Sequence, residues 1–181
     1  LVEISAPAGY LVAKEITFTV TKNTSAQYRI TTISDPNSLN GDQVTIMVTD
    51  QPLSLRIKKE TSSGDLLAGA TLELYKRNTD GSKGSKIDSF TTNRTNMYTV
   101  EFTKLQAGQE YLLVETAAPN GFLKSGDIKF TIEANGSITK QYLQQENGTW
   151  KESRVSGNTV IMTDDEEAVT LSKIDSGTNG N

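Results

Sequence analysis

Hydrophobic and polar residues alternate in several short stretches of the chain. Alternation with a period of two is typical of β-strands that bury one face. The pattern is found in LSLRIKKE (53–60), TLELYK (71–76), MYTVEFT (97–103), YLLVET (111–116), IKFTIE (128–133) and TVIMTD (159–164). No stretch keeps the 3.6-residue period of a helix, so the sequence predicts an all-β protein.

Turn signals separate these expected strands. Glycine with asparagine, aspartate or serine favours tight turns between paired strands. Such clusters occur in SSGD (62–65), NTDGSKGS (78–85), PNG (119–121), EANGS (133–137) and ENGT (146–149). Short strands joined by such turns predict a β-sandwich of roughly immunoglobulin size.

Two parts of the chain have nearly the same sequence. LVEISAPAGYLVAKEITFTV (1–20) aligns without a gap with LVETAAPNGFLKSGDIKFTI (113–132), at an offset of 112 residues and with 10 identities. VTIMVTDQPLSLRIKK (44–59) resembles NTVIMTDDEEAVTLSK (158–173) at an offset of 114 residues. One repeat unit therefore spans about 112 to 114 residues.

This period divides the chain into three parts. We expect residues 1–51 to be the C-terminal portion of one unit and residues 52–165 to be a complete unit. Residues 166–181 should be a linker and the first strand of a following unit, so the sequence is expected to begin and end inside units. The joints DQP (50–52) and DDEEA (164–168) are short, which predicts close coupling between neighbouring units.

Charged residues lie at apolar positions of the pattern. A count at period two puts Lys59, Glu115 and Asp164 on the same strand faces as the aliphatic residues. Each one alone is also compatible with a charged strand end that reaches solvent at the rim. The repeat argues against that interpretation, because the flanking units have the same residue types at the corresponding positions, namely Glu3, Asp50 and Lys173.

Composition restricts the chemistry that is available. The 181 residues include no cysteine and no histidine, which excludes disulfides, thiolate nucleophiles, the usual zinc sites and a Ser-His-Asp triad. The 18 basic and 22 acidic residues are interspersed, so nucleic acid is not an expected partner. No apolar run is long enough to span a membrane, and no insertion of this segment is expected. A cysteine-free composition rich in Ser, Thr, Asn and Gly fits the outside of a Gram-positive bacterium.

The motifs around the three charged residues resemble those of a known family. Lys59 precedes GDLLAGATLEL, Glu115 lies in LVETAAPNGF, and Asp164 ends VIMTD. This combination is similar to the Cna protein B-type domains of Gram-positive adhesins and pilins, in which the ETAAPNGF stretch is called an E-box. The resemblance covers residues 52–165 completely and the flanking parts as pieces of neighbouring copies. It implies a prealbumin-like, reverse-immunoglobulin β-sandwich in tandem repeats.

The resemblance also implies a spontaneous isopeptide bond, with Lys59 as nucleophile, Asp164 as acceptor and Glu115 as catalyst. The chemistry is physically reasonable, because burial disfavours charged forms and can leave a neutral amine beside a protonated glutamate. Glu115 can then polarise the acceptor carboxyl and move protons while the amine attacks and water leaves. Lys58 and Asp165 are the rival nucleophile and acceptor, but strand parity points both outward. The family more often uses asparagine as the acceptor.

The function implied is that of a structural stalk module in an extracellular, cell-wall-anchored adhesin or pilin-like protein of a Gram-positive bacterium. Such a domain reacts once with itself, so it is not an enzyme with turnover, and neither a cofactor nor a metal is expected. The expected partners are adjacent repeats of the same polypeptide. A host matrix or cell-surface ligand is expected to bind through another region.

Other functions fit the sequence less well. A module that binds a host matrix protein or glycan through its loops is the main alternative, but the turns have few aromatic or basic residues. A hydrolase with Glu115 and Asp164 as paired carboxylates needs a cleft, whereas parity buries both. The acidic run 164–167 lacks the ligand spacing of a calcium loop. Trp150 with Tyr142 is more typical of strand packing than of a sugar platform.

Overall fold

The structure is a computed structural model, which describes residues 1–168 and 171–172. The described chain contains strands and two short 3-10 turns, and it has no α-helix and therefore none long and apolar enough to cross a membrane. The prediction of an all-β protein is confirmed. The strands are β1 (Tyr10–Leu11), β2 (Phe18–Lys22), β3 (Tyr28–Ile33), β4 (Gln51–Pro52), β5 (Leu55–Thr61), β6 (Thr71–Arg77), β7 (Lys83–Thr91), β8 (Tyr98–Val100), β9 (Glu110–Ala117), β10 (Ile128–Thr131), β11 (Gln141–Gln144), β12 (Trp150–Ser153), β13 (Val155–Ser156) and β14 (Thr159–Asp164), with 3-10 turns η1 (Pro36–Ser38) and η2 (Phe102–Lys104).

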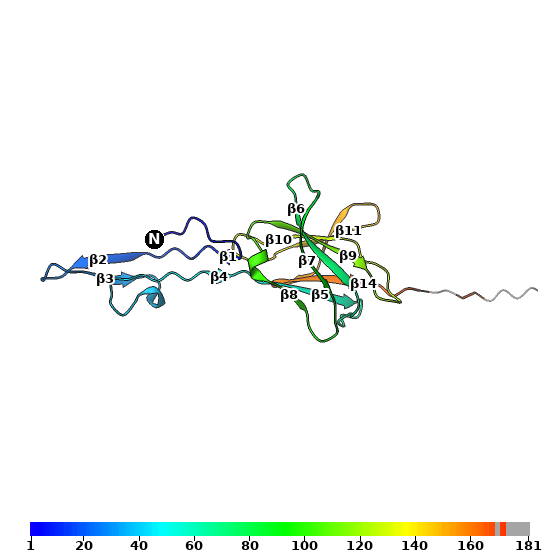
Figure 1. Ribbon diagram of the computed structural model, residues 1–181, viewed down its shortest axis with the longest axis horizontal. Coiled ribbons are helices and arrows are strands. Elements are labelled where there is room, and N and C mark those ends of the chain that lie inside the picture. Colours follow the sequence, from blue (N-terminus) through cyan, green and yellow to red (C-terminus); the bar gives the residue numbers. More distant parts are fainter. Residues whose placement is uncertain (169–170, 173–181) are drawn as a thin grey trace, which may run out of the picture.

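Strands β5 to β14 form a sandwich of two sheets (Figure 1). The six-stranded sheet has the order β12-β11-β10-β9-β6-β7, and the four-stranded sheet has the order β13-β14-β5-β8. In the second sheet, β5 and β14 pair in parallel, with Lys59 opposite Met162. The first and last long strands of this unit are therefore direct neighbours.

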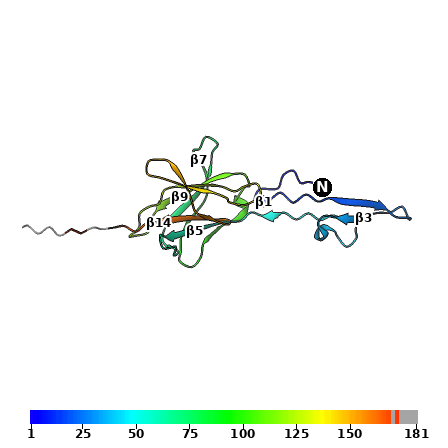
Figure 2. The same ribbon diagram turned by 180° about the vertical axis from the view of Figure 1, so that it is seen from behind.

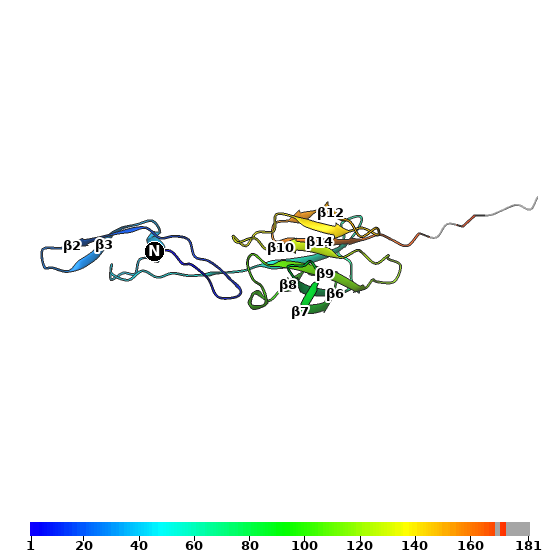
Figure 3. The same cartoon turned by 90° about the horizontal axis from the view of Figure 1, so that it is seen from above.

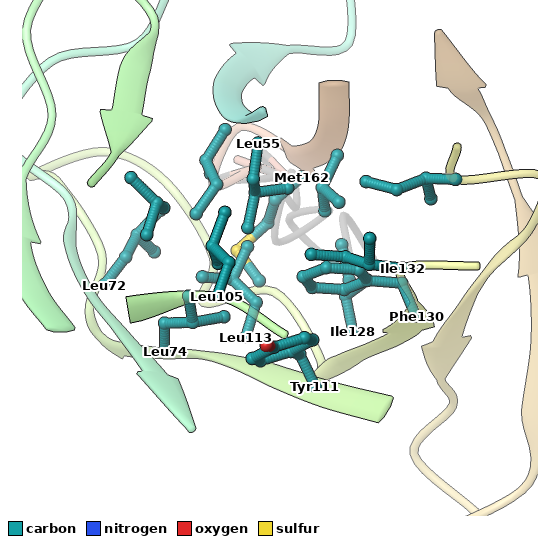
Figure 4. Packing of buried hydrophobic residues seen from close by; sticks show 14 of the residues in the cluster. Leu55, Leu72, Leu74, Leu105, Tyr111, Leu113, Ile128, Phe130, Ile132 and Met162 are labelled. Atoms are coloured by element: carbon teal, nitrogen blue, oxygen red, sulfur yellow. The ribbon is translucent and has the colours of Figure 1, made fainter. Parts of the chain in front are cut away.

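Apolar side chains from both sheets fill the space between them (Figure 4). Leu55 and Met162 come from the four-stranded sheet, while Leu72, Leu113 and Phe130 come from the six-stranded sheet, and each is at most 1% exposed. These residues are the ones that strand alternation assigns to the buried faces. Burying a side chain of this size contributes roughly 1.5–3 kcal/mol each, so this core is the main source of stability.

The structure also contains strands that the alternation pattern does not predict. β7 and β12 are the two edges of the six-stranded sheet and β11 lies next to β12, and many of the side chains of these strands remain in contact with solvent. Such strands need few apolar residues, so their sequences KGSKIDSFT, QYLQ and WKES lack a clear period. The strand expected at 97–103 ends at Val100, because the backbone turns at η2. The five predicted turns each contain a glycine at positive φ, a conformation that is costly for other residues.

Residues 1–50 lie at one end of the long axis, outside the sandwich (Figures 2 and 3). Their main regular element is the antiparallel β2–β3 hairpin, and their buried hydrophobic side chains are Ile16 and Ile30. Many other large hydrophobic side chains in this region are exposed, because no second sheet covers them in the described chain. These are Leu1, Val2, Ile4, Val12, Phe18, Val20, Tyr28, Val44, Met47 and Val48.

The two parts meet in a tight junction. The Gly9 N–H donates to the Leu105 carbonyl at 3.0 Å, and the Leu53 N–H donates to the Gly9 carbonyl at 2.7 Å. The rings of Tyr10 and Phe102 pack edge to face with their centroids 5.2 Å apart. Gly9 has φ +89°, and a Cβ at this position would lie 2.7 Å from the Phe102 carbonyl oxygen. Only glycine fits here, so the junction is closely packed, as the short joint predicts.

Candidate functional site

Lys59, Glu115 and Asp164 meet inside the sandwich. They are 2%, 0% and 1% exposed, so they form a charged cluster within an apolar core. The Lys59 Nζ donates to Asp164 Oδ1 and lies 3.1 Å from Glu115 Oε1. Strand parity predicted the direction of each side chain, and the structure brings all three together. An active-site cleft for a hydrolase is incompatible with this burial.

The register of the strands explains the position of the lysine. Leu55 and Ile57 of β5 point into the core, and Lys59 is the next residue on that face. In the parallel β5–β14 ladder Lys59 lies opposite Met162, and Asp164 lies two residues further along on the same face of β14. The long lysine side chain extends along the strand direction and reaches the aspartate at the strand end.

Glu115 approaches the lysine from the facing sheet. It belongs to β9, and its Oε2 accepts a hydrogen bond from the Ser125 N–H at 2.7 Å. Its Oε1 is close to the lysine but outside hydrogen-bonding geometry, and Asp164 Oδ2 has no protein hydrogen-bond partner. A buried polar atom without a partner costs about 1–3 kcal/mol. The cluster is therefore an incompletely satisfied polar site.

Burial changes the acidity of Glu115. Desolvation raises the pKa of Glu115 above its ordinary value of 4.5, although the Lys59 charge and the Ser125 N–H oppose this shift. A raised pKa keeps the carboxyl protonated to a higher pH than for a glutamate in water. Glu115 is therefore suited to donate a proton to a neighbouring carboxyl oxygen.

The rival residues lie on the outside. The Lys58 side chain is 25% exposed and binds Glu60 Oε2 at 2.5 Å, and Asp165 is exposed. Glu60 follows Lys59 on the outward face of β5, yet it is only 3% exposed. Lys58 and Arg154 cover it, and their hydrogen bonds lower its pKa, although burial alone raises it. No signal in β5 indicates this cover, because Arg154 comes from a distant part of the sequence.

Two of the predicted residues of the flanking units, Glu3 and Asp50, lie at the surface of the described chain. Glu3 and Asp50 are half-buried and line a surface hollow of about 370 Å³. No second sheet covers residues 1–50 in the described chain, so the expectation that Glu3 and Asp50 face the inside of a sandwich stays a prediction. Lys173 lies outside the described residues.

The aromatic pair on the surface is covered by cations. Lys129 Nζ lies 4.9 Å from the centre of the Trp150 ring and 5.3 Å from that of Tyr142, and the Arg77 guanidinium carbon lies 5.6 Å from the Trp150 ring centre. These contacts are typical of cation–π packing.

In the part of the chain that the structure describes, no group of three or more acidic side chains is arranged to hold a metal ion.

Comparisons with known proteins identify the fold. The family model described as SpaA, prealbumin-like fold domain, matches residues 53–147, just over half of the chain. A C-terminal fragment of the pilus adhesin SpaC from Lactobacillus rhamnosus GG is 22% identical, with a TM-score of 0.50, over 93% of this chain and 76% of that chain. This likeness supports the fold alone. Together with the family match it confirms the prealbumin-like β-sandwich.

Two further structures are similar at lower scores. The pilus adhesin SpaC from the same organism, in an open conformation, is 20% identical over 93% of this chain and 24% of that chain, with a TM-score of 0.48. BcpA, the major pilin subunit of Bacillus cereus, is 23% identical over 63% of this chain and 29% of that chain, with a TM-score of 0.39. The present chain thus spans about a quarter of the length of that SpaC structure. A comparison with curated proteins finds no similar sequence.

Proposed function

Because the chain belongs to the family of SpaA prealbumin-like fold domains, we propose that it is a structural stalk module of a pilus or adhesin, stabilised by an isopeptide bond between Lys59 and Asp164. The module stands outside the cell, attached to the wall of a Gram-positive bacterium. One observation carries the proposal: a lysine amine lies between two carboxyl groups in a core that excludes solvent. The domain reacts once with itself and has no turnover.

The reaction joins the Lys59 amine to the Asp164 carboxyl carbon. The Lys59 ammonium first gives one proton to the Asp164 carboxylate. The neutral Nζ then attacks Cγ of the protonated Asp164 carboxyl while protonated Glu115 donates to the oxygen that leaves. The new C–N bond forms, one C–O bond breaks, and the oxygen leaves as water with two protons. Glu115 accepts a proton from the nitrogen and returns to its protonated form. Because the fold holds the amine and the carboxyl group in position, their effective molarity can be on the order of 10⁵–10⁸ M, which favours the condensation.

Burial also favours the product over the unreacted cluster. The unreacted cluster buries ionisable groups and leaves Asp164 Oδ2 without a protein partner. Ion pairs in a low-dielectric interior pay a large desolvation cost. An amide replaces the ammonium and the carboxylate by one neutral group, and the departing water removes an oxygen from the core. The apolar surroundings thereby favour bond formation.

The position of the bond suits a load-bearing role. The chain enters the unit through β5 and leaves it after β14, and these strands are neighbours. Tension on the two ends would pass from Lys59 through the bond to Asp164. Residues 60–163 would then lie outside the path of the force, so the sandwich would resist unravelling.

Repeated junction contacts support a tandem arrangement of residues 1–51, 52–165 and 166–181. At the first junction the Leu53 N–H donates to the Gly9 carbonyl at 2.7 Å, and 112 to 114 residues later the Glu167 N–H donates to the Gly121 carbonyl at 2.9 Å. We expect adjacent repeats of the same polypeptide to be the partners of this unit. A ligand of the host would bind through another region.

Intact mass spectrometry of the folded chain tests the bond. We expect a mass one water molecule below the sequence mass, and fragment spectra that join Lys59 to Asp164. Lys59→Arg and Asp164→Ala should restore the full mass, whereas the matched neighbours Lys58→Arg and Asp165→Ala should keep the loss. Glu115→Gln should slow the reaction about 10²–10⁴-fold. A full sequence mass in well-folded protein would overturn the proposal.

A further inference from the structure

A buried glutamine on β11 takes no part in the chemistry of the proposed reaction. Gln141 is 0% exposed and lies on the inward face of the six-stranded sheet, opposite Phe130 of β10 and Ser153 of β12. A buried side-chain amide is costly unless its donor and its acceptor both have partners. The partners of Gln141 therefore indicate what this residue does.

Gln141 binds the backbone of the opposite sheet. Its Oε1 accepts from the Ile161 N–H at 2.9 Å, and its Nε2 donates to the Ile161 carbonyl at 2.6 Å. One donor and one acceptor thus meet the peptide groups of a single residue of β14, as a neighbouring strand does in a ladder. Nε2 also donates to Ser153 Oγ at 3.0 Å, which helps to orient the amide. The side chain of Gln141 therefore replaces one rung of a β-ladder.

The strand that would supply this rung leaves the sheet. β13 pairs with the start of β14, where Val155 lies opposite Val160 and Ser156 lies opposite Thr159. Ser153, two residues before Val155, already belongs to β12 in the other sheet. β13 therefore does not continue beside Ile161, and Gln141 takes its place there.

This rung lies close to the reactive end of β14. Asp164 is three residues beyond Ile161, about 10 Å along a strand that rises about 3.3 Å per residue. Beyond Asp164, the Leu123 N–H donates to the Asp165 carbonyl at 2.9 Å. This edge of β14 is thus fixed before and after the acceptor, while β5 pairs with the opposite edge.

We propose that Gln141 is a positioning residue for the reaction between Lys59 and Asp164, and that it acts by holding β14 through the backbone of Ile161. Its hydrogen bonds go to Ile161 and Ser153, and to neither reacting residue. A displacement of about 1 Å between reacting groups can lower a rate about 10²-fold. A firmly held strand therefore keeps Cγ of Asp164 within reach of the amine. This inference rests on the proposed function, because it concerns the geometry of the same bond.

The rate of water loss tests this role. Pulse-labelled cell-free translation yields the whole chain before the bond has formed, and intact mass spectrometry then follows the loss of one water in molecules that resist a protease. Gln141→Leu keeps the approximate size of the side chain but removes its hydrogen bonds, and we expect it to slow the loss about 10–10²-fold. Ser153→Ala leaves both hydrogen bonds to Ile161 in place and should slow the loss much less.

A carboxyl group at the same position provides a rescue. In Gln141→Glu a protonated carboxyl keeps one donor and one acceptor for Ile161, whereas a carboxylate has lost the donor. The rate relative to the unchanged chain should therefore rise as pH falls, while the relative rate of Gln141→Leu stays constant. The charged groups near this position are Arg154, which lines the same small hollow as Gln141, and Glu60, to which Arg154 binds. Both are present in every chain compared, so their titration cancels in the ratio.

A core variant separates positioning from stability. Leu74 lies in β6, which β9 and β10 separate from β11, and it is 0% exposed. Leu74→Ala should lower the unfolding midpoint at least as much as Gln141→Leu, when both are measured together with Asp164→Ala, which prevents the bond. The rate of water loss in folded Leu74→Ala should nevertheless stay close to that of the unchanged chain. Slow water loss without a greater loss of stability is then specific to Gln141.

These measurements separate the two proposals. An unchanged rate in folded Gln141→Leu, or equal slowing by Leu74→Ala, would overturn the positioning role and leave the stalk function standing. A Gln141→Glu variant that stays as slow as Gln141→Leu at every pH would also overturn it. A folded, unchanged chain that keeps its full sequence mass would refute the proposed function and this role with it.

Discussion

Residues 1–50 and residues 113–164 share a sequence pattern but differ in burial. Phe18 is 42% exposed and its counterpart Phe130 is 1% exposed, while Val20 is 49% exposed and its counterpart Ile132 is fully buried. The β2–β3 and β10–β11 pairs are both antiparallel. The difference is the facing sheet, which only the complete unit has in the described chain. Alternation sets the face on which a side chain lies, but a second layer is needed to bury it.

The two regions also differ in what surrounds their paired carboxyl groups. Both regions hold a glutamate whose Oε2 accepts a backbone N–H, and both have an aspartate at the end of the corresponding segment. Among the described residues, a lysine lies between the two carboxyl groups only in the sandwich, where Lys59 of β5 contacts Glu115 and Asp164.

The largest expected effect comes from removing the lysine. Lys59 and Asp164 are 105 residues apart, and closing a loop of about 100 residues stabilises a domain by about 4.7 kcal/mol. Lys59→Ala also leaves two buried carboxyl groups without their cation. We expect it to lower the free energy of unfolding by about 5 kcal/mol or more, measured by guanidinium titration. Trp150, the single tryptophan, lies in β12 and reports on the complete unit.

A surface lysine provides the control for this variant. Lys140 forms an exposed pair with Glu152 at 3.6 Å, and such pairs contribute less than about 1 kcal/mol. Lys140→Ala should therefore barely change the unfolding midpoint. Equal midpoints for Lys59→Ala and Lys140→Ala would contradict a stabilising bond.

A matched pair of phenylalanines tests the difference in burial. Phe130→Ala should lower the free energy of unfolding by about 3–5 kcal/mol, because it leaves a cavity in the core. Phe18→Ala, at the corresponding position of the repeat, should change the Trp150 transition by less than about 0.5 kcal/mol. Similar losses for both variants would show that residues 1–50 are packed in solution as tightly as the sandwich.

The acidity of Glu115 predicts a pH dependence for Lys59→Ala. Burial raises the pKa of Glu115, and the variant removes the lysine charge that opposes the shift. Between the ordinary value of 4.5 and the raised pKa, the folded state binds more protons than the unfolded state. Stability should therefore fall as pH rises through this window, by at most about 1.4 kcal/mol per pH unit for this group.

Denaturant titrations at several pH values measure this slope. In the double variant Lys59→Ala with Glu115→Gln the slope should be smaller, because the titrating group is lost. A slope that is equal in both variants would show that Glu115 is not the group responsible.

The smallest expected effect is at the junction between the two regions. Gly9→Ala would place a Cβ against the Phe102 carbonyl at positive φ, which costs about 1–2 kcal/mol locally. We expect a broader distribution of interatomic distances in small-angle X-ray scattering, with the Trp150 transition unchanged. Gly41→Ala is the control, since a Cβ there would meet no atom within 4 Å. Identical scattering from both variants would show that the junction does not depend on this contact.

Much of the fold can be predicted from the sequence, for reasons that particular residues make clear. Leu55 and Ile57 reveal the buried face of β5, and the same count gives the side on which Lys59 lies. Edge strands such as β7 and β12 are missed, because strands that bury few side chains need no apolar period. The burial of Glu60 cannot be predicted from the strand pattern, because Arg154, which covers it, is remote in the sequence.

The sequence by itself determined the strand periodicity, the turns and the repeat that pairs Glu3 with Glu115 and Asp50 with Asp164. These features depend on neighbouring residues and on regular backbone geometry, which a linear pattern records. Only the tertiary structure decided that β5 lies beside β14 in a parallel ladder and that β9 faces both. Burial depends on what packs across from a strand. The same carboxyl groups therefore hold a lysine in one unit and line an open hollow in the other.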